Sequence, residues 1–191
     1  MKLIIFLATA VCTVAALAIV AGICLYHYIG IPKSVGEKEY KYRTEEISVE
    51  YNGISLYGKA LVPVGESGQK FKTVIYAHGA NSNYKSDMTT LKSLAESGIA
   101  CYTFDFYGWT SRSTGPKGTE WFKGTDMRDN DAYVNKVLLQ SEDLNAVIEK
   151  VKTFDFVDTD NIFLLGSSMG GVTVATCATT HSEDIRGIVL Q

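Results

Sequence analysis

The sequence lacks the features that mark several common protein classes. Its 191 residues include 18 Lys or Arg against 21 Asp or Glu, a net charge of -3, and the basic residues are scattered without an arginine-rich stripe. Such a chain presents no electrostatic surface for nucleic acid. It has no Cys-x-x-Cys pair, which argues against a zinc knuckle or a redox pair, and no Asn-x-Ser/Thr acceptor for N-glycosylation. We therefore expect no nucleic-acid partner, no metal ion and no cofactor.

Cysteine and histidine are both scarce. The four cysteines, at positions 12, 24, 101 and 177, all fall in apolar segments, which predicts packed thiols. The three histidines are His27, His78 and His181. Their scarcity bears on catalysis, because a nucleophilic serine needs a neighbouring base, most often histidine.

An apolar run occupies the N-terminus, from residue 3 to residue 31. It is longer than the roughly 20 residues that a membrane-spanning helix needs. It also exceeds the apolar core of a secretory signal, and no clear cleavage site follows. We predict a membrane anchor in residues 1–31, with a cleaved signal peptide as the alternative.

The position of the anchor suggests how the rest of the chain is arranged. Residues 32–43 are a polar tether, and residues 44–191 form the folded domain. The flanking Lys and Arg residues favour a cytoplasmic domain, whereas the short N-terminal tail favours export. We expect a single-pass membrane protein with its domain outside the cytoplasm.

The remaining sequence alternates strand-like and helix-like segments. Apolar and polar residues alternate on both sides of Asn52-Gly53, a pair that suits a tight hairpin turn. Short apolar runs predict buried strands, and spacings of three and four predict helices. The strands are expected in 71–79, 99–106, 161–166 and 185–191, and the helices in about 85–97, 134–151 and 169–180. This order predicts an α/β fold with a mostly parallel sheet, helices on both faces and antiparallel strands at the leading edge.

The segment GSSMG, residues 166–170, lies between a predicted strand and a predicted helix. It fits the pattern Gly-x-Ser-x-Gly with Ser168 at the centre, whereas Ser167 has Leu165 and Met169 two residues away. A serine at a sharp strand-to-helix turn takes a strained backbone conformation, and a Cβ two residues before or after it would collide. Ser168 is therefore the candidate nucleophile, and Gly166 and Gly170 support its turn.

A second candidate element follows the strand that begins at residue 71. There His78-Gly79-Ala80 begins a loop that, in this architecture, supplies one backbone N–H to an oxyanion hole. The residue after the nucleophile, Met169, supplies the other. His78 and Gly79 are expected to hold this loop, and Asp105 is expected to brace a neighbouring one.

The order of HGANSN, AESGIACYTFDFYGWTSRSTG, DLNAVIEKVK, NIFLLGSSMGG and IRGIVLQ resembles the α/β-hydrolases, and within them the cinnamoyl (feruloyl) esterase-like hydrolases. The resemblance covers residues 44–191 and implies an α/β-hydrolase fold. It also implies a serine hydrolase in which Ser168 forms an acyl-enzyme with a small-molecule ester. Trp109, Trp121 and Phe122 are expected either to line an aromatic acyl pocket or to pack a lid.

The resemblance also implies an acid and then a histidine late in the chain, after further strands. Only 23 residues follow Ser168, and their one histidine, His181, is expected about 20 Å along the helix that starts at the nucleophile. We expect that the acid and the base of the triad, and the last strands, are not in this chain, which would make it a fragment. The alternatives are a peptidase, thioesterase or lipase of the same superfamily, or an inactive remnant that serves as an interaction module.

Overall fold

The structure is a computed structural model that describes residues 40–122, 128–180 and 182–191. The chain divides into two compact units, residues 1–37 and 38–191, and every described residue lies in the second unit. The membrane anchor predicted for residues 3–31 lies outside the described residues and stays a prediction. Within the described ranges, no helix is both long and apolar enough to cross a membrane.

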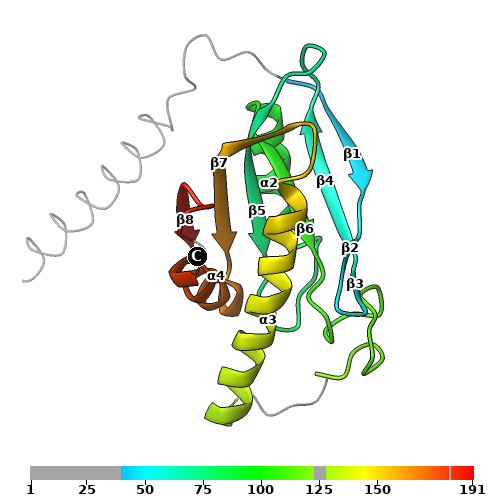
Figure 1. Cartoon of the computed structure of the whole chain (residues 1–191), viewed down its shortest axis with the longest axis vertical. Coiled ribbons are helices and arrows are strands. Elements are labelled where there is room, and N and C mark those ends of the chain that lie inside the picture. Colours follow the sequence, from blue (N-terminus) through cyan, green and yellow to red (C-terminus); the bar gives the residue numbers. More distant parts are fainter. Residues whose placement is uncertain (1–39, 123–127, 181) are drawn as a thin grey trace, which may run out of the picture. The chain divides into compact units, whose positions relative to one another are not determined.

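A six-stranded sheet organises the folded unit, in the order β1-β4-β6-β5-β7-β8 (Figure 1). Strands β6, β5, β7 and β8 run parallel, whereas β1 and β4 pair antiparallel at the leading edge. The bounds are β1 (Tyr42–Glu46), β4 (Gly58–Pro63), β5 (Phe71–Ala77), β6 (Ala100–Phe104), β7 (Val157–Gly166) and β8 (Gly187–Leu190). The predicted mostly parallel sheet with an antiparallel edge is thereby confirmed.

The hairpin predicted at Asn52-Gly53 is present but does not join the large sheet. Asn52 and Gly53 have φ of 45° and 75°, the two positive values that a type I′ turn requires. The flanking strands β2 (Val49–Tyr51) and β3 (Ile54–Leu56) pair only with each other among the described strands. The antiparallel edge is formed by β1 and β4, which lie on either side of this hairpin in the sequence.

Helices cover both faces of the sheet because neighbouring residues on a strand point to opposite faces. On β6, Tyr102 and Phe104 belong to the larger apolar core with α3 (Asn130–Val151) and α4 (Met169–Thr180), whereas Cys101 belongs to a smaller core. The smaller core contains Leu91 from α2 (Met88–Glu96). Figure 1 shows α2 and α3 on opposite sides of the sheet.

Helices α2 and α3 differ from the predicted bounds at their starts, and α2 begins at Met88, three residues after the predicted start. Gly98, with φ of 85°, ends α2 as predicted, and α4 has the predicted bounds. Helix α3 begins at Asn130, four residues before the predicted start, because the Asp129 carboxylate accepts hydrogen bonds from the N–H groups of Asp131 and Ala132. That first turn is polar, so apolar spacing alone could not reveal it.

The thiols of Cys101 and Cys177 are buried and free, as predicted. Burial raises the pKa of each to about 12, so neither is a reactive thiolate at neutral pH.

Helix α4 lies unusually close to the backbone of β5. A Cβ on Gly170 would lie 2.2 Å from the carbonyl oxygen of Ala77 and 2.6 Å from that of His78. Both distances are shorter than any real contact of a Cβ, and the atoms met are backbone atoms that cannot rotate away. The missing side chain therefore sets the distance between the helix and the strand.

A buried carboxylate joins the hairpin to α3. Asp143, on α3, is 3% exposed and accepts hydrogen bonds from the Tyr51 hydroxyl and, at 2.8 Å, from the Tyr107 N–H. Burial raises the pKa of Asp143 to about 7, despite the opposing effect of both hydrogen bonds. Sequence reasoning missed this residue because an Asp within a helix normally faces solvent.

Gly170→Ala is expected to destabilise the protein by about 3 kcal/mol or more, because the added methyl forces α4 away from β5. Gly171→Ala is the matched control on the same helix, since its Cβ would come no closer than 3.3 Å to another atom. There the gain in helix propensity, about 1 kcal/mol, offsets the tight contact. Free energies of unfolding from urea titrations test both, and equal losses in the two variants would contradict the account.

The raised pKa of Asp143 predicts a pH-dependent stability. The unfolded chain loses this proton near its ordinary pKa of 3.8, whereas the folded chain keeps it until about pH 7. The folded state therefore binds the extra proton between these values, and stability falls as pH rises from about 4 to about 7. Asp143→Asn removes this titration. We therefore expect the free energy of unfolding of this variant to rise, relative to that of the parent, by up to about 4 kcal/mol between pH 4 and pH 8. Urea titrations at several pH values test this, with exposed Asp160→Asn as control; parallel pH profiles of parent and Asp143→Asn would contradict it.

Candidate active site

Ser168 occupies a sharp turn between β7 and α4. Its φ is 54°, although residues with a Cβ rarely take positive values. Strand β7 ends at Gly166 and α4 begins at Met169, so two residues reverse the chain. The side chain of Ser168 is exposed although its neighbours from Leu164 onward are largely buried. The turn therefore presents the hydroxyl at the carboxyl end of the parallel strands.

The turn closes only because Gly166 has no side chain. A Cβ there would lie 2.5 Å from the carbonyl oxygen of Gly170 and 2.6 Å from the Cα of Gly171. These are backbone atoms of the first helical turn, so an alanine would force the strand and the helix apart. The glycine spacing in the sequence thus corresponds to a close backbone contact across the turn.

The loop after β5 comes close to the same turn. A Cβ on Gly79 would lie 3.2 Å from the Cβ of Ser168 and 3.8 Å from its Oγ. The Ser167 N–H donates to the carbonyl oxygen of Ala77 at 3.1 Å, which fixes the end of β5 against the turn. The 78–80 loop and Ser168 therefore lie on the same rim of the sheet, where the sequence placed them.

Two backbone N–H groups at this rim have no acceptor among the described residues. They belong to Ala80, in the loop, and Met169, the first residue of α4. The neighbouring Ser168 N–H, in contrast, donates to the backbone oxygen of Gln191 at 2.8 Å. An open pocket of about 370 Å³ lies beside these groups. Its lining residues are Tyr76, Gly79, Ala80, Ser82, Ser86, Asp87, Ser167, Ser168 and Gln191.

His78 holds two loops together. It is fully buried, its Nδ1 lies 2.8 Å from the carbonyl oxygen of Gly79, and its Nε2 lies 3.2 Å from the N–H of Phe106. Nδ1 therefore carries the proton and Nε2 accepts. Burial lowers the pKa of His78, so the ring is neutral. With both nitrogens occupied, this histidine cannot take a proton from Ser168.

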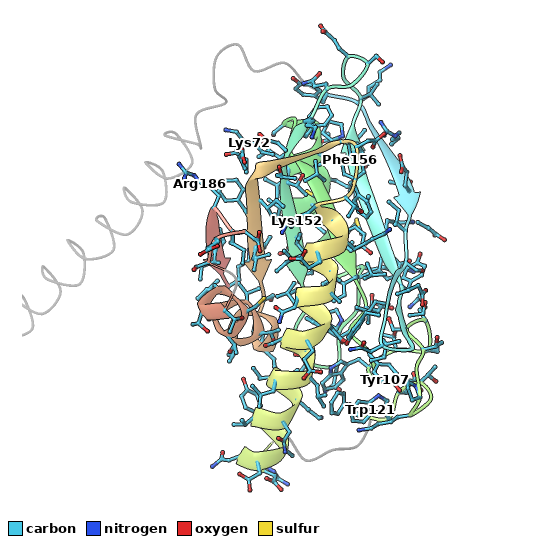
Figure 2. The ribbon with its side chains drawn as sticks, in the orientation of Figure 1. Lys72, Tyr107, Trp121, Lys152, Phe156 and Arg186 are labelled. Carbon is cyan, nitrogen blue, oxygen red and sulfur yellow. The ribbon has the colours of Figure 1, made fainter. Side chains whose placement is uncertain are left out.

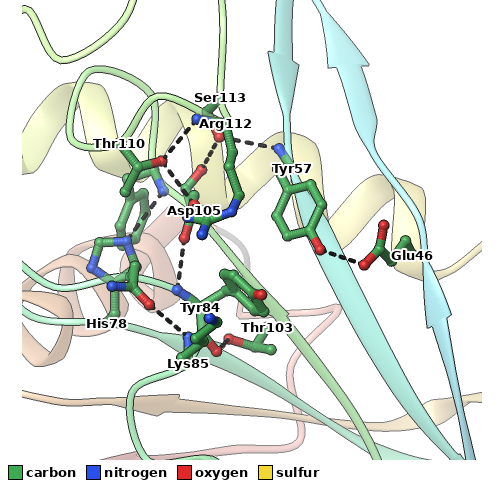
Figure 3. Close-up of polar contacts among 12 residues, drawn as sticks. Glu46, Tyr57, His78, Tyr84, Lys85, Thr103, Asp105, Thr110, Arg112 and Ser113 are labelled. Carbon is green, nitrogen blue, oxygen red and sulfur yellow. Dashed lines mark hydrogen bonds and ion pairs between the residues drawn. The ribbon is translucent and has the colours of Figure 1, made fainter.

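Asp105 braces the loop beside the site, as the sequence predicted (Figure 3). One carboxylate oxygen accepts from the Tyr84 N–H at 2.6 Å. The other accepts from the Thr110 hydroxyl at 2.7 Å and lies 3.4 Å from Arg112 Nη1. The Asp105 side chain is fully buried, so these donors replace water around its charge. They fix the loops that follow β5 and β6.

The aromatic residues expected near the site pack against each other instead. Trp109 and Phe122 are buried, with ring centroids 5.7 Å apart, and Lys136 Nζ lies 4.5 Å from the Trp109 ring. Trp121 lies beside Tyr107 near the hairpin, across α3 from α4 in Figure 2. None of the three aromatic residues lines the pocket of Ser168. Of the two alternatives, the described side chains therefore fit packing better than an aromatic acyl pocket beside Ser168.

Sequence reasoning missed Asp87, which also lines the pocket. It precedes α2 with φ of 57°, and its side chain makes no hydrogen bond to the N–H groups of that helix. It fell inside the helix predicted at about 85–97, which indicated no role at the site. His27 and His181 lie outside the described residues. Within the described ranges, no group of three or more His, Cys, Asp or Glu could hold a metal ion.

Several solved structures share this fold. The dienelactone hydrolase from Anabaena variabilis aligns with a TM-score of 0.60 at 17% identity, covering 79% of this chain and 63% of that one. A hypothetical protein from Pseudomonas aeruginosa aligns with a TM-score of 0.62 at 15% identity, covering 83% of this chain and 45% of that one. An epoxide hydrolase from Vigna radiata aligns with a TM-score of 0.55 at 16% identity, covering 77% of this chain and 38% of that one. The chain thus spans less than two thirds of each of these proteins, and the likeness shows the fold alone.

No curated protein matches the sequence. The model of one protein family does, over residues 68–191, and its description is "Serine aminopeptidase, S33". The matched segment contains both the loop of His78 and the turn of Ser168. The chain belongs to the serine aminopeptidase S33 family of α/β-hydrolases.

Proposed function

We propose that this chain carries the nucleophile and the oxyanion hole of a serine hydrolase that cleaves carboxylic esters. The observation that carries the proposal is the Ser168 turn, where an exposed hydroxyl is held at a positive φ beside unpartnered N–H groups. Strain of this kind persists at sites where the surrounding structure enforces it. In a purely structural turn, a glycine or asparagine would serve at lower cost.

In the proposed reaction, the Ser168 Oγ attacks the ester carbonyl carbon and gives up its proton to a base. The carbonyl oxygen becomes negatively charged, and the N–H groups of Ala80 and Met169 donate hydrogen bonds to it. The alcohol then leaves with a proton, and an acyl-enzyme remains. Water attacks that ester, releases the carboxylic acid and returns the proton to Ser168.

The position of Met169 supports its part in this reaction. Its N–H is the first of α4, where the helix dipole adds a partial positive charge. A developing negative charge is stabilised strongly by donors that are already oriented, because they need not reorganise.

A base for Ser168 is not found among the described histidines, because both ring nitrogens of His78 are already bonded. The base and the acid of the triad therefore remain unassigned among the described residues. Without them, the oxyanion hole alone supports only weak residual catalysis.

The family description favours a second candidate, cleavage of a peptide bond at the amino end of a peptide. Both reactions proceed through the same acyl-enzyme, so Ser168, Ala80 and Met169 would keep their roles. The finer resemblance to cinnamoyl esterases remains a prediction. Turnover of methyl ferulate, p-nitrophenyl esters and amino-acyl anilides would separate the three substrate classes.

We expect a fluorophosphonate probe to label Ser168 in the full chain, and imidazole, supplied as an external base, to accelerate labelling about tenfold or more. Ser168→Ala is expected to abolish labelling, whereas Ser167→Ala retains it, because Ser168 is exposed at the centre of the turn and Ser167 is half-buried. Intact-mass spectrometry measures the adduct. Equal labelling of Ser168→Ala would show that another residue is the nucleophile, whereas no labelling of a folded sample with imidazole would support a non-catalytic remnant.

Ala80→Pro tests the oxyanion hole, since proline has no N–H to donate. Proline requires a negative φ. Ala80 is not among the residues with a positive φ, so its backbone does not exclude proline on that ground. We expect probe labelling to slow by about 10²–10³-fold, the usual effect of losing one such donor. Ala80→Ser keeps the N–H and is expected to label within about threefold of the parent. If both variants label at the parent rate, the Ala80 N–H is not part of the hole.

A further inference from the structure

A second pocket, of about 140 Å³, lies between the β2-β3 hairpin, the segment that follows β6 and helix α3. Three aromatic rings line it, and they belong to Tyr51, Tyr107 and Trp121. Figure 2 shows Tyr107 and Trp121 near each other, and their ring centroids are 5.5 Å apart. The described residues that line this pocket include none that line the pocket of Ser168. The cavity is therefore a separate candidate site with aromatic walls.

Two carboxylates of α3 also line this second pocket. Glu142 is exposed, whereas Asp143 is buried and accepts hydrogen bonds from the Tyr51 hydroxyl and the Tyr107 N–H. Burial and, to a smaller extent, the nearby charge of Glu142 raise the pKa of Asp143 to about 7. Lys117 is the one cation among the described lining residues. Above pH 7, the charged groups around the cavity are therefore negative in sum.

One aromatic wall of the pocket already attracts a cation. Lys117 Nζ lies 4.4 Å from the centroid of the Trp121 ring, within the distance at which a cation is drawn to an aromatic face. The Lys117 N–H donates to the Tyr107 hydroxyl at 2.6 Å, which holds its backbone, but its side chain is exposed and can move away from the ring. A lysine ammonium is also strongly hydrated, so it gains less from an aromatic wall than a cation covered by methyl groups.

We propose that this second pocket binds a small quaternary ammonium compound of the size of choline, which takes the place of the Lys117 ammonium over Trp121. The three rings attract its charge, and the two carboxylates balance it. Its methyl groups need no hydrogen-bond acceptor, which suits a site where both oxygens of Asp143 already accept from the protein. A cavity of about 150 Å³ is known to hold a benzene-sized molecule, so a group of this size fits.

Choline and neohexyl alcohol, in which a carbon replaces the nitrogen, test this assignment because they share a shape and differ in charge. NMR titrations of the isotope-labelled full chain measure both dissociation constants at about pH 8, where Asp143 is mostly charged. We expect choline to bind about tenfold more tightly than neohexyl alcohol. Choline is expected to shift the indole N–H signal of Trp121, whereas the signal of Trp109, which is not among the described lining residues, stays in place.

Two variants locate the ligand in the pocket. Lys117→Ala removes the competing cation at an exposed position, and we expect choline to bind about threefold more tightly. Lys85→Ala is the matched control, because Lys85 Nζ lies over another ring, 5.8 Å from the centroid of Tyr84, and no change in choline binding is expected. Trp121→Leu replaces the ring by an apolar side chain and is expected to weaken choline binding about fivefold, with neohexyl alcohol affected less than twofold.

No binding of choline to the folded chain, or equal binding of choline and neohexyl alcohol, would overturn the proposal. So would an affinity for choline that is unchanged in both Lys117→Ala and Trp121→Leu, since the ligand would then lie elsewhere. Phosphocholine carries the same ammonium group beside a phosphate that Glu142 and Asp143 repel, so tighter binding of phosphocholine than of choline would contradict the assignment to a free ammonium compound. These titrations are independent of the reactivity of Ser168.

Discussion

The passage of the chain from β7 into α4 is the constraint on which the rest of the site depends. Strand β7 and helix α4 approach so closely that no Cβ fits at Gly166, and α4 lies so close to the end of β5 that no Cβ fits at Gly170. Ser168, between them, is forced to a positive φ and points away from the buried backbone. The same close approach sets α4 against the end of β5, which brings the 78–80 loop next to Ser168.

The buried polar groups around this turn act mainly by holding loops. His78 joins the loop after β5 to the loop after β6, and Asp105 joins the same two segments through other donors. Because each is buried and bonded, moving either loop would leave a polar group without a partner. Asp143 likewise holds the hairpin through its hydrogen bonds. Because its pKa is raised, burying this carboxylate lowers the stability of the fold as the pH rises. Among the described residues, the amides of Ala80 and Met169 have no acceptor at this rim of the sheet.

Much of this could be predicted from the sequence, because close backbone contacts require glycine and buried strands require apolar runs. The spacing of Gly166 and Gly170 identified the turn, the apolar runs identified four parallel strands, and Asn52-Gly53 identified the hairpin. The alternation of apolar strand segments with helical segments also predicted helices on both faces. These features are local, so they appear directly in the order of residues.

Features that depend on tertiary contacts could not be predicted in this way. Trp109 and Phe122 looked like pocket residues, but they pack around Lys136 from a helix that begins beyond them in the sequence. The hairpin could not be separated from the main sheet, because β2 and β3 show the same alternation as β1 and β4. Asp87 fell inside the predicted helix at about 85–97, because its backbone conformation and its enclosed oxygen leave no trace in the sequence.

The most direct test of this account is an experimental structure of the full chain after reaction with a fluorophosphonate. The account predicts phosphorus bonded to the Oγ of Ser168, with its free oxygen about 3 Å from the backbone nitrogens of both Ala80 and Met169. Phosphorus bonded to another residue would contradict the central claim. So would a free oxygen that points to solvent while both amides bind elsewhere.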